Sequence, residues 1–260
     1  METQPWAELK TTDFKGDAPS RIALLPVAAT EQHGPHLPLG TDAYILEAIL
    51  ARLDVSAEVL LLPMQSVGDS LEHGDFPGTL SQRAEILIAS WIALGHAVAD
   101  SGIRRLAILN SHGGQPQIVD IVAKRLRAER KMTVARINTF LLGVPSGTFS
   151  DDELAYGFHG GEVETSMMLA IRPDLVDMEA AADFPNRASE MTSEYHTLRA
   201  EGPAALAWQA QDLNPAGVTG NAAMADAERG ENTLLHIARR VSEALADLAA
   251  ADLTVSRGPV

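Results

Sequence analysis

The sequence predicts an α/β fold in which a mostly parallel sheet is flanked by helices. Two observations carry this prediction. Short apolar runs alternate with longer stretches of helical periodicity, and the runs are apolar at consecutive rather than alternate positions. Continuous apolar runs are typical of strands buried on both faces, as in a parallel sheet covered by helices on each side. At 260 residues the chain has the size of one such unit, so residues 1–260 are expected to form a single domain.

The expected elements follow from these patterns in order along the chain. Strands are expected at residues 22–27, 59–63, 106–110 and 134–139. Helices are expected at 43–53, 82–101, 115–129, 162–171 and 222–249. From 173 to 220 the pattern loosens into Pro, Gly and Asn with short apolar pieces, which fits a cap, an oligomer contact or a long loop. The sequence leaves these three alternatives open.

The charge balance and the absence of cysteine exclude several classes of function. Asp and Glu number 35 against 20 Lys and Arg, and the net charge of −15 repels nucleic acid phosphates and anionic membrane surfaces. A small molecule is therefore the expected partner. Without cysteine, any metal must bind to nitrogen and oxygen ligands. The N-terminus lacks a signal-peptide pattern and no apolar run spans a bilayer, so a cytoplasmic location is expected.

Polar residues directly follow the first and third predicted strands, where ligands bind in open α/β sheets. After the first strand, Glu31, His33 and Asp42 lie in a short segment rich in Gly and Pro. Carboxylate and imidazole together suit zinc, manganese or iron, and a carboxylate can bridge two ions. The alternative is a polar loop with an incidental cluster of charges. After the third strand, His112 precedes a Gly-Gly pair; alone it would be structural, but beside the first loop it becomes a candidate ligand.

A third polar segment begins at His159 and leads into a predicted helix with two glutamates. Residues two apart on a helix point in nearly opposite directions, so Glu162 and Glu164 cannot both face one site. Glu164 lies on the face of Met167 and Met168, and a carboxylate on such an apolar stripe must be neutralised, paired or bound to a metal. Glu164 is therefore a candidate ligand, the alternatives being an ion pair with an Arg or a helix cap. Glu162 is expected to be solvated in the first helical turn.

These motifs, in this order, resemble those of the creatininase family of metal-dependent amidohydrolases. The resemblance rests on Glu31-Gln32-His33-Gly34-Pro35-His36 with Asp42, on Asn110-Ser111-His112-Gly113-Gly114, and on His159-Gly160-Gly161 followed by Glu164-Thr165-Ser166. Softer matches are Phe76-Pro77-Gly78-Thr79 and Gly217-Val218-Thr219-Gly220 running to Gly230-Glu231. Together they cover nearly the whole chain.

The resemblance implies an α/β fold, a homohexamer and two divalent ions, most simply zinc or manganese, with iron(II) as an alternative. It implies that Asp42 bridges the two ions, that Glu31 and His112 complete one of them, and that His33 binds the other. Two ions that share Asp42 would hold a water between them and lower its pKa, which supplies a hydroxide to attack an amide carbonyl. The implied reaction is hydrolysis of a non-peptide C–N bond.

The sequence differs from creatininase itself at the position of the fifth ligand. The resemblance implies a Glu two positions after the histidine that matches His112, but Gly114 stands there. Glu164 is the expected replacement, and Glu162 is the alternative; if it is not a ligand, Glu162 is a candidate proton relay. His159 is expected to protonate the leaving nitrogen or to hydrogen-bond the tetrahedral intermediate, since the pKa of histidine lies near working pH. The alternative for His159 is a helix cap or a backbone tie.

Creatinine itself is not the expected substrate. In creatininase, tryptophans flank the flat substrate ring, and the corresponding stretches here contain Phe140, Tyr156 and Phe158 instead. In creatininase, the position before the histidine that matches His159 is acidic, whereas here it is Phe158. A different small amide, cyclic or open, is therefore expected. Two other hypotheses remain, a keto-sugar or inosose-type hydrolase that breaks a C–C bond or ring, and a non-catalytic metal-binding homologue.

The remaining histidines have no evident metal partners in the sequence. His36 and His73 are expected to line the pocket, because they stand in or near the motifs above. His96, His196 and His236 lie in predicted helices or loops without partners and are expected to be structural or exposed.

Overall fold

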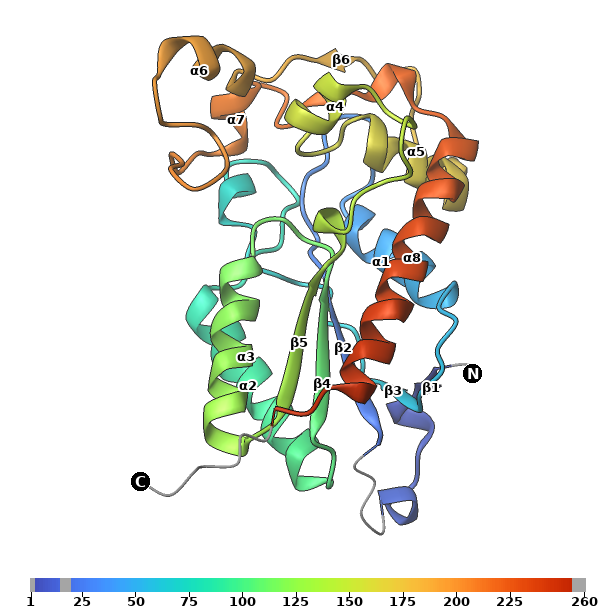
Figure 1. Cartoon of the computed structure of the whole chain (residues 1–260). Coiled ribbons are helices and arrows are strands. Elements are labelled where there is room, and N and C mark those ends of the chain that lie inside the picture. Colours follow the sequence, from blue (N-terminus) through green and yellow to red (C-terminus); the bar gives the residue numbers. More distant parts are fainter. Residues whose placement is uncertain (1–2, 15–19, 254–260) are drawn as a thin grey trace.

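A five-stranded parallel sheet forms the centre of the structure, a computed structural model that describes residues 3–14 and 20–253 (Figure 1). The strand order is β1-β3-β2-β4-β5, and every neighbouring pair is parallel. The strands are β1 (Gln4–Pro5), β2 (Ile22–Val27), β3 (Val59–Leu61), β4 (Arg105–Asn110) and β5 (Thr133–Asn138).

The register of the central strands aligns their carboxyl ends. Along β2 and β4, Ile22 pairs with Arg105 and Val27 pairs with Asn110, and Asn110 in turn pairs with Asn138 at the end of β5. The residues that follow Val27, Asn110 and Asn138 therefore leave the sheet at the same edge.

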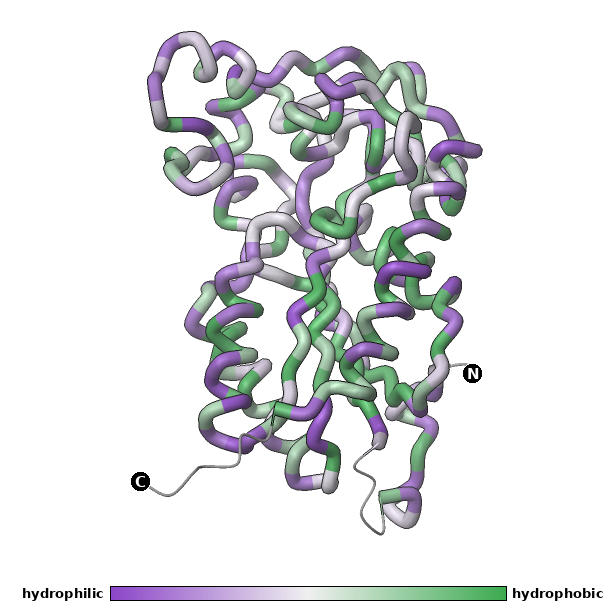
Figure 2. Tube along the Cα trace, viewed as in Figure 1, coloured by the Kyte–Doolittle hydropathy of each residue, from purple (hydrophilic) through white to green (hydrophobic). Residues whose placement is uncertain are grey.

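Helices cover both faces of the sheet and make a three-layer arrangement (Figure 1). On one face, α2 (Ala84–Asp100) and α3 (Pro116–Arg130) pack with alternate residues of β2 around the buried Trp91. On the other face lie α1 (Thr41–Ala51), α5 (Glu162–Ile171) and α8 (Ala227–Ala250). The strands are uniformly apolar because both of their faces are covered, and Figure 2 shows the central strands in the colours of hydrophobic residues.

Helices α5 and α8 pack closely because α8 carries Gly230 at the contact. A Cβ added at Gly230 would lie 1.9 Å from the carbonyl oxygen of Ser166 in α5, so no larger residue fits without a shift. Asp226 caps α8, since its side chain accepts a hydrogen bond of 2.9 Å from the backbone N–H of Arg229. These contacts fix α5, and with it Glu162 and Glu164, against the sheet.

The segment between β5 and α8 contains short elements that lie over the carboxyl edge of the sheet (Figure 1). They include α4 (Asp151–Tyr156), α6 (Ala188–Glu194), α7 (Ala210–Leu213) and the antiparallel pair β6 (Asp183–Phe184) and β7 (Gly220–Asn221). A small apolar cluster holds α6 and α7 together and includes Phe158, Met191, Trp208 and Leu213. Single-turn 3-10 helices lie at Trp6–Glu8, Thr11–Phe14, Leu71–His73, Thr139–Leu141, Pro173–Leu175 and Ala222–Met224.

The parallel sheet between helices is confirmed, and most expected elements agree with the structure to within about two residues at each end. The helix expected at 222–249 is the exception: it begins at Ala227, because Asp226 caps it and residues Ala222–Met224 form a separate 3-10 turn. Strand β1 was not expected, since two residues carry no periodicity. In the described part of the chain, none of the helices is long and apolar enough to cross a membrane.

Candidate metal centre

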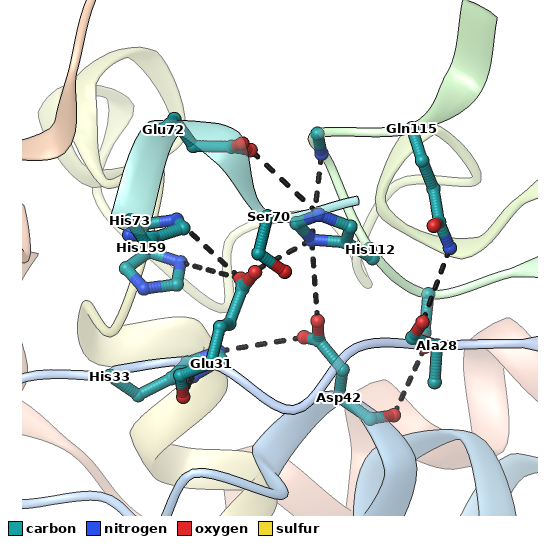
Figure 3. A network of polar contacts seen from close by, with 12 residues as sticks. Ala28, Glu31, His33, Asp42, Ser70, Glu72, His73, His112, Gln115 and His159 are labelled. Atoms are coloured by element: carbon teal, nitrogen blue, oxygen red, sulfur yellow. Dashed lines mark hydrogen bonds and ion pairs between the residues drawn. The ribbon is translucent and has the colours of Figure 1, made fainter. Parts of the chain in front are cut away.

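Four strongly buried residues from three segments meet at the carboxyl edge of the sheet (Figure 3). Glu31 and His33 follow β2, Asp42 lies in the first turn of α1, and His112 follows β4. Their relative exposures are between 0% and 3%. Buried carboxylates and imidazoles at this density need compensating charge, hydrogen bonds or a metal ion.

The His33 ring is fixed so that one nitrogen is free toward the carboxylates. Its Nδ1–H donates to the backbone carbonyl of Glu31 at 3.1 Å, so in the neutral ring the lone pair is on Nε2. Nε2 lies 3.5 Å from Asp42 Oδ1 and 4.0 Å from Glu164 Oε2.

The His112 ring has the opposite tautomer and also aims a free nitrogen inward. Its Nε2–H donates to the backbone carbonyl of Asp69 at 2.8 Å. Nδ1 then faces Glu31 Oε1 at 3.2 Å and Asp42 Oδ2 at 3.4 Å, with a long 3.5 Å contact from the N–H of Gly114. Backbone carbonyls that fix the outer nitrogen of a ligand histidine are common around metal ions in proteins.

Two ligand groups overlap at Asp42. Glu31, Asp42 and His112 form one, and His33, Asp42 and Glu164 form the other; in each, the ligand atoms lie within 4.8 Å of one another. Glu31, His33 and His159 form a third such group. Among the described residues, the buried atoms Glu31 Oε2, His33 Nε2 and Asp42 Oδ2 have no hydrogen-bond partner. Atoms of this kind are normally satisfied, so the residues fit a pair of divalent ions that share Asp42.

The electrostatics of these residues also favour a cation. Burial opposes ionisation, yet the imidazoles of His112, His73 and His159 hold the pKa of Glu31 well below its usual range. Burial alone would lower the pKa of His33, but the carboxylates of Asp42 and Glu164 raise it to about 9. Burial would also lower the pKa of His112, but the carboxylates of Glu31 and Asp42 raise it well above its usual value. Protons on these rings occupy positions that a metal ion would take over.

His159 lies beside this centre, and a hydrogen bond to a backbone carbonyl fixes its tautomer. Its Nε2–H donates to the backbone carbonyl of Gln32 at 2.7 Å, so Nδ1 carries the lone pair and lies 3.8 Å from Glu31 Oε1. Burial, together with the charges of His33 and His73, lowers the pKa of His159 well below its usual value, in contrast to the expectation of a pKa near working pH. The backbone of His159 is also tied, because its carbonyl accepts a 2.8 Å hydrogen bond from Thr219 N.

Glu72 and His73 enter the site from the 3-10 turn after β3. His73 Nε2 lies 3.5 Å from Glu31 Oε1, and Glu72 Oε1 lies 3.8 Å from His112 Nε2. Burial raises the pKa of Glu72 to about 7 and lowers that of His73 to about 4. Glu72 was not predicted from the sequence to be a site residue. Its one signal was its place beside His73, just ahead of the Phe-Pro-Gly-Thr motif at 76–79.

Glu162 and Glu164 point to different places, as the helix geometry requires. Glu164 Oε2 accepts a 2.6 Å hydrogen bond from Gly160 N and faces His33. The expectation that Glu162 would be solvated is wrong: Glu162 is 5% exposed and forms an ion pair with Arg229 of α8. The close packing of α8 on α5 brings this arginine over the first turn of α5.

A cavity of about 490 Å³ lies beside Asp42 and Glu164. Most of its lining is apolar and includes Phe140, Val144, Leu154, Phe158, Met167 and Ile237. The ionisable residues that line it are the carboxylates of Asp42, Glu153 and Glu164, and the described lining contains no Lys, Arg or His. Such a cavity offers apolar contacts and, in its described lining, no cationic side chain that could pair with an anionic group.

The other histidines lie outside the metal centre. His36 faces away from the cavity, because its Nε2 contacts Thr165 Oγ1 at 3.0 Å and its ring stacks on Phe184. His96 pairs with Glu129 at 3.0 Å on the surface. His196 is exposed and His236 half-buried, as expected for residues outside the site.

The sequence matches a known protein family over most of its length. The family model Creatininase, described as creatinine amidohydrolase, matches residues 6–245. A mycofactocin precursor peptide peptidase of Mycobacterium ulcerans is 31% identical over 216 residues, which cover 80% of this chain and 77% of the relative. Creatinine amidohydrolase of Pseudomonas putida is 29% identical, with 69% and 74% covered. A 3-dehydro-scyllo-inosose hydrolase of Thermotoga maritima is 24% identical, with 81% and 72% covered.

Solved structures of creatininases share the fold. A creatinine amidohydrolase crystal structure superposes with a TM-score of 0.74 at 22% identity and covers 97% of this chain and 100% of that one. A manganese creatininase has a TM-score of 0.71 at 22% identity, with 95% of this chain and 98% of that one covered. A mutant creatininase of Zn-Zn type has a TM-score of 0.69 at 23% identity, with 95% and 98% covered.

Proposed function

Because the chain belongs to the creatininase family, we propose that it is a metal-dependent hydrolase that cleaves the C–N bond of a small amide. The observation that carries the proposal is the pair of ligand groups that share Asp42, with buried ligand atoms that lack hydrogen-bond partners among the described residues. A protein that only needed a stable fold would gain nothing from leaving these atoms unsatisfied.

In this proposal, Glu31, Asp42 and His112 hold one divalent ion, and His33, Asp42 and Glu164 hold the other. Glu164 thus takes the place of the carboxylate that creatininase carries at the position of Gly114. Glu162 is neutralised by Arg229, so we assign it a structural role instead of metal binding or proton transfer. Zinc or manganese suits this nitrogen and oxygen donor set, and solved creatininases include a manganese form and a Zn-Zn form.

When bound, two such ions lower the pKa of a water molecule toward neutrality and polarise the amide carbonyl. A residue of this chain, His159, transfers the proton. His159 Nδ1 accepts it from the attacking water, because Nε2–H is held by the carbonyl of Gln32. As the C–N bond breaks, His159 Nδ1 returns the proton to the leaving nitrogen, which departs as a neutral amine. Glu31, 3.8 Å away, stabilises the imidazolium that forms between these steps.

The cavity indicates the class of amide. Phe140 and Phe158 line it and supply flat apolar surfaces, whereas Tyr156 is not part of its lining. Most of the lining is apolar, and its described part contains no Lys, Arg or His that could pair with a free carboxylate of the substrate. We therefore propose an uncharged amide with an apolar substituent as the substrate.

The decisive experiment replaces the shared ligand. Asp42→Ala should abolish binding of both ions and amide hydrolysis while the chain stays folded, since the apolar core lies on the two faces of the sheet. Metal analysis of the purified protein measures this directly. Asp120→Ala, which removes a half-exposed carboxylate on α3, is the control and should retain two ions per chain. Two equivalents of metal retained in Asp42→Ala would overturn the assignment.

Two alternatives have specific support from the relatives. The mycofactocin peptidases act on a precursor peptide according to their names, which favours a peptide amide as a second candidate substrate. The inosose hydrolase supports a keto-sugar or ring hydrolase of another reaction class. Parallel assays of the metal-loaded protein with small amides, apolar peptides and cyclic keto-sugars separate these three. A protein that binds metal and turns over none of them would be a non-catalytic homologue.

The proposal also includes a homohexamer, a cytoplasmic location and one domain over residues 1–260, all expected from the sequence. Sedimentation of the metal-loaded protein tests the subunit count.

A further inference from the structure

The side-chain amide of Gln32 has a fixed orientation. Its oxygen Oε1 accepts a hydrogen bond of 2.9 Å from the backbone N–H of Gly34. Its nitrogen Nε2 donates a hydrogen bond of 2.6 Å to the backbone carbonyl of Gly217. A flipped amide would set nitrogen against an N–H and oxygen against a carbonyl, so the backbone on both sides selects one orientation.

This orientation determines the tautomer of His73. The second hydrogen of Gln32 Nε2 points at His73 Nδ1, 2.7 Å away. An amide NH₂ group can only donate, so Nδ1 must be the acceptor and cannot carry a proton. The proton of the neutral imidazole is then on Nε2, which faces Glu31 Oε1 at 3.5 Å (Figure 3).

We propose that His73 is a positioning residue that orients the Glu31 carboxylate with its Nε2–H, and that Gln32 sets the tautomer which makes this possible. The distance of 3.5 Å is longer than a normal hydrogen bond, so the contact orients the carboxylate without saturating it. With Oε1 facing an N–H donor, Oε2, which has no hydrogen-bond partner among the described residues, stays available to a metal. The significance for Glu31 as a ligand rests on the proposed function, whereas the tautomer does not.

The same assignment explains why His73 is not itself a ligand. It is 3% exposed and lies among the ligands, yet its inward nitrogen carries a proton and has no lone pair to offer. Its ring also stacks on that of His159, with centroids 4.2 Å apart and planes at 28°. His73 thus helps to hold His159 in place as well as Glu31.

The direct test is the tautomer of His73 in the full-length protein. Long-range ¹H–¹⁵N correlation spectra of ¹⁵N-labelled protein distinguish protonated from bare ring nitrogens, and the spectrum of His73→Gln identifies the His73 signals. The expected result is a bare Nδ1 and a protonated Nε2, both without metal and with saturating Zn²⁺. A proton on Nδ1 in the wild type would overturn the proposal. Because the metal-free measurement needs neither metal nor substrate, it stands or falls independently of the proposed activity.

Matched variants test the role in positioning. His73→Gln can place an amide N–H near the position of Nε2, whereas His73→Leu fills similar space without a donor. We expect His73→Leu to weaken Zn²⁺ binding about 10- to 100-fold and His73→Gln to retain most of the affinity. Gln32→Glu should move the proton of His73 to Nδ1, because a carboxylate accepts, and should weaken Zn²⁺ binding as His73→Leu does. Equal losses in His73→Gln and His73→Leu would indicate a packing role only and refute the positioning role.

Discussion

The carboxylate of Glu72 occupies the space that a side chain at Gly114 would need. A Cβ added at Gly114 would lie 1.9 Å from Glu72 Oε1 and 2.6 Å from His112 Nε2. The end of Glu72 is flexible and can move aside. The ring of His112 is less free, because its Nε2–H is bound to the carbonyl of Asp69. The observed orientation of His112 therefore requires a residue without a side chain at position 114.

We accordingly predict that Gly114→Ala weakens metal binding about tenfold or more, by displacing the ring of His112. Competition with a chelating dye measures the affinity, and circular dichroism checks that the variant is folded. Gly113→Ala is the matched control, since a Cβ there would meet no atom within 4 Å. Equal affinities of the two variants would show that His112 does not depend on this space.

The parts of the site that follow from local pattern were predictable from the sequence. The apolar runs of β2 and β4 are continuous because both sheet faces are covered, and parallel strands in register end at one edge. That rule alone brings Glu31 and His112 together. The helical period likewise separates the directions of Glu162 and Glu164.

The parts that depend on contacts between distant segments were not predictable. Glu72 reaches the centre from a single 3-10 turn whose position no periodicity encodes. His73, which was expected to line the pocket, contacts Glu31 from the same turn. Glu162 was expected in solvent because nothing in its own helix indicates Arg229, which lies 67 residues later and arrives through the packing of α8 on α5. Tertiary packing decides such pairs, and sequence pattern describes only the separate elements.

The two glutamates of α5 should respond differently to the same substitution. Glu164→Gln keeps the size and the acceptor for Gly160 N but removes the charge that faces His33. We predict that it lowers occupancy of one of the two ions and slows amide hydrolysis by at least tenfold. Metal content per chain and kcat are the measurements.

Glu162→Gln is the matched comparison. It should leave the metal content unchanged and lower the free energy of unfolding by about 1–3 kcal/mol, because Arg229 loses its buried charged partner. Denaturant unfolding measures this loss. If Glu162→Gln empties a metal position and Glu164→Gln does not, the ligand is the other carboxylate.

Metal uptake should strengthen as the pH rises. In the metal-free protein the carboxylates of Asp42 and Glu164 raise the pKa of His33 to about 9 against the effect of burial. The ring therefore holds a proton below about pH 9, and that proton must leave before Nε2 can bind a metal. Apparent affinity for Zn²⁺ should rise about tenfold per pH unit for each proton released, and the contribution of His33 should level off above its pKa.

Calorimetry in two buffers of different ionisation enthalpy counts the protons released on Zn²⁺ binding. The titration of Zn²⁺ into a chelator in the same buffers is the control for metal speciation. An affinity that stays constant from pH 6 to pH 9, after correction for the control, would contradict the prediction.

Finally, we predict that creatinine is a poor substrate of the metal-loaded protein. Phe140 and Phe158 line the cavity, whereas the resemblance to creatininase implies tryptophans in the corresponding stretches and an acidic residue at the position of Phe158, which could bind a guanidine-like group. The apolar lining instead suits an uncharged amide with an apolar substituent. The value of kcat/KM for creatinine should stay below ~10⁴ M⁻¹s⁻¹, the lower end of typical enzyme efficiency, and below that for the best apolar amide in a panel. Metal analysis of the same preparation ensures that both ions are present, so that a value at or above this limit would reject the assignment of the cavity.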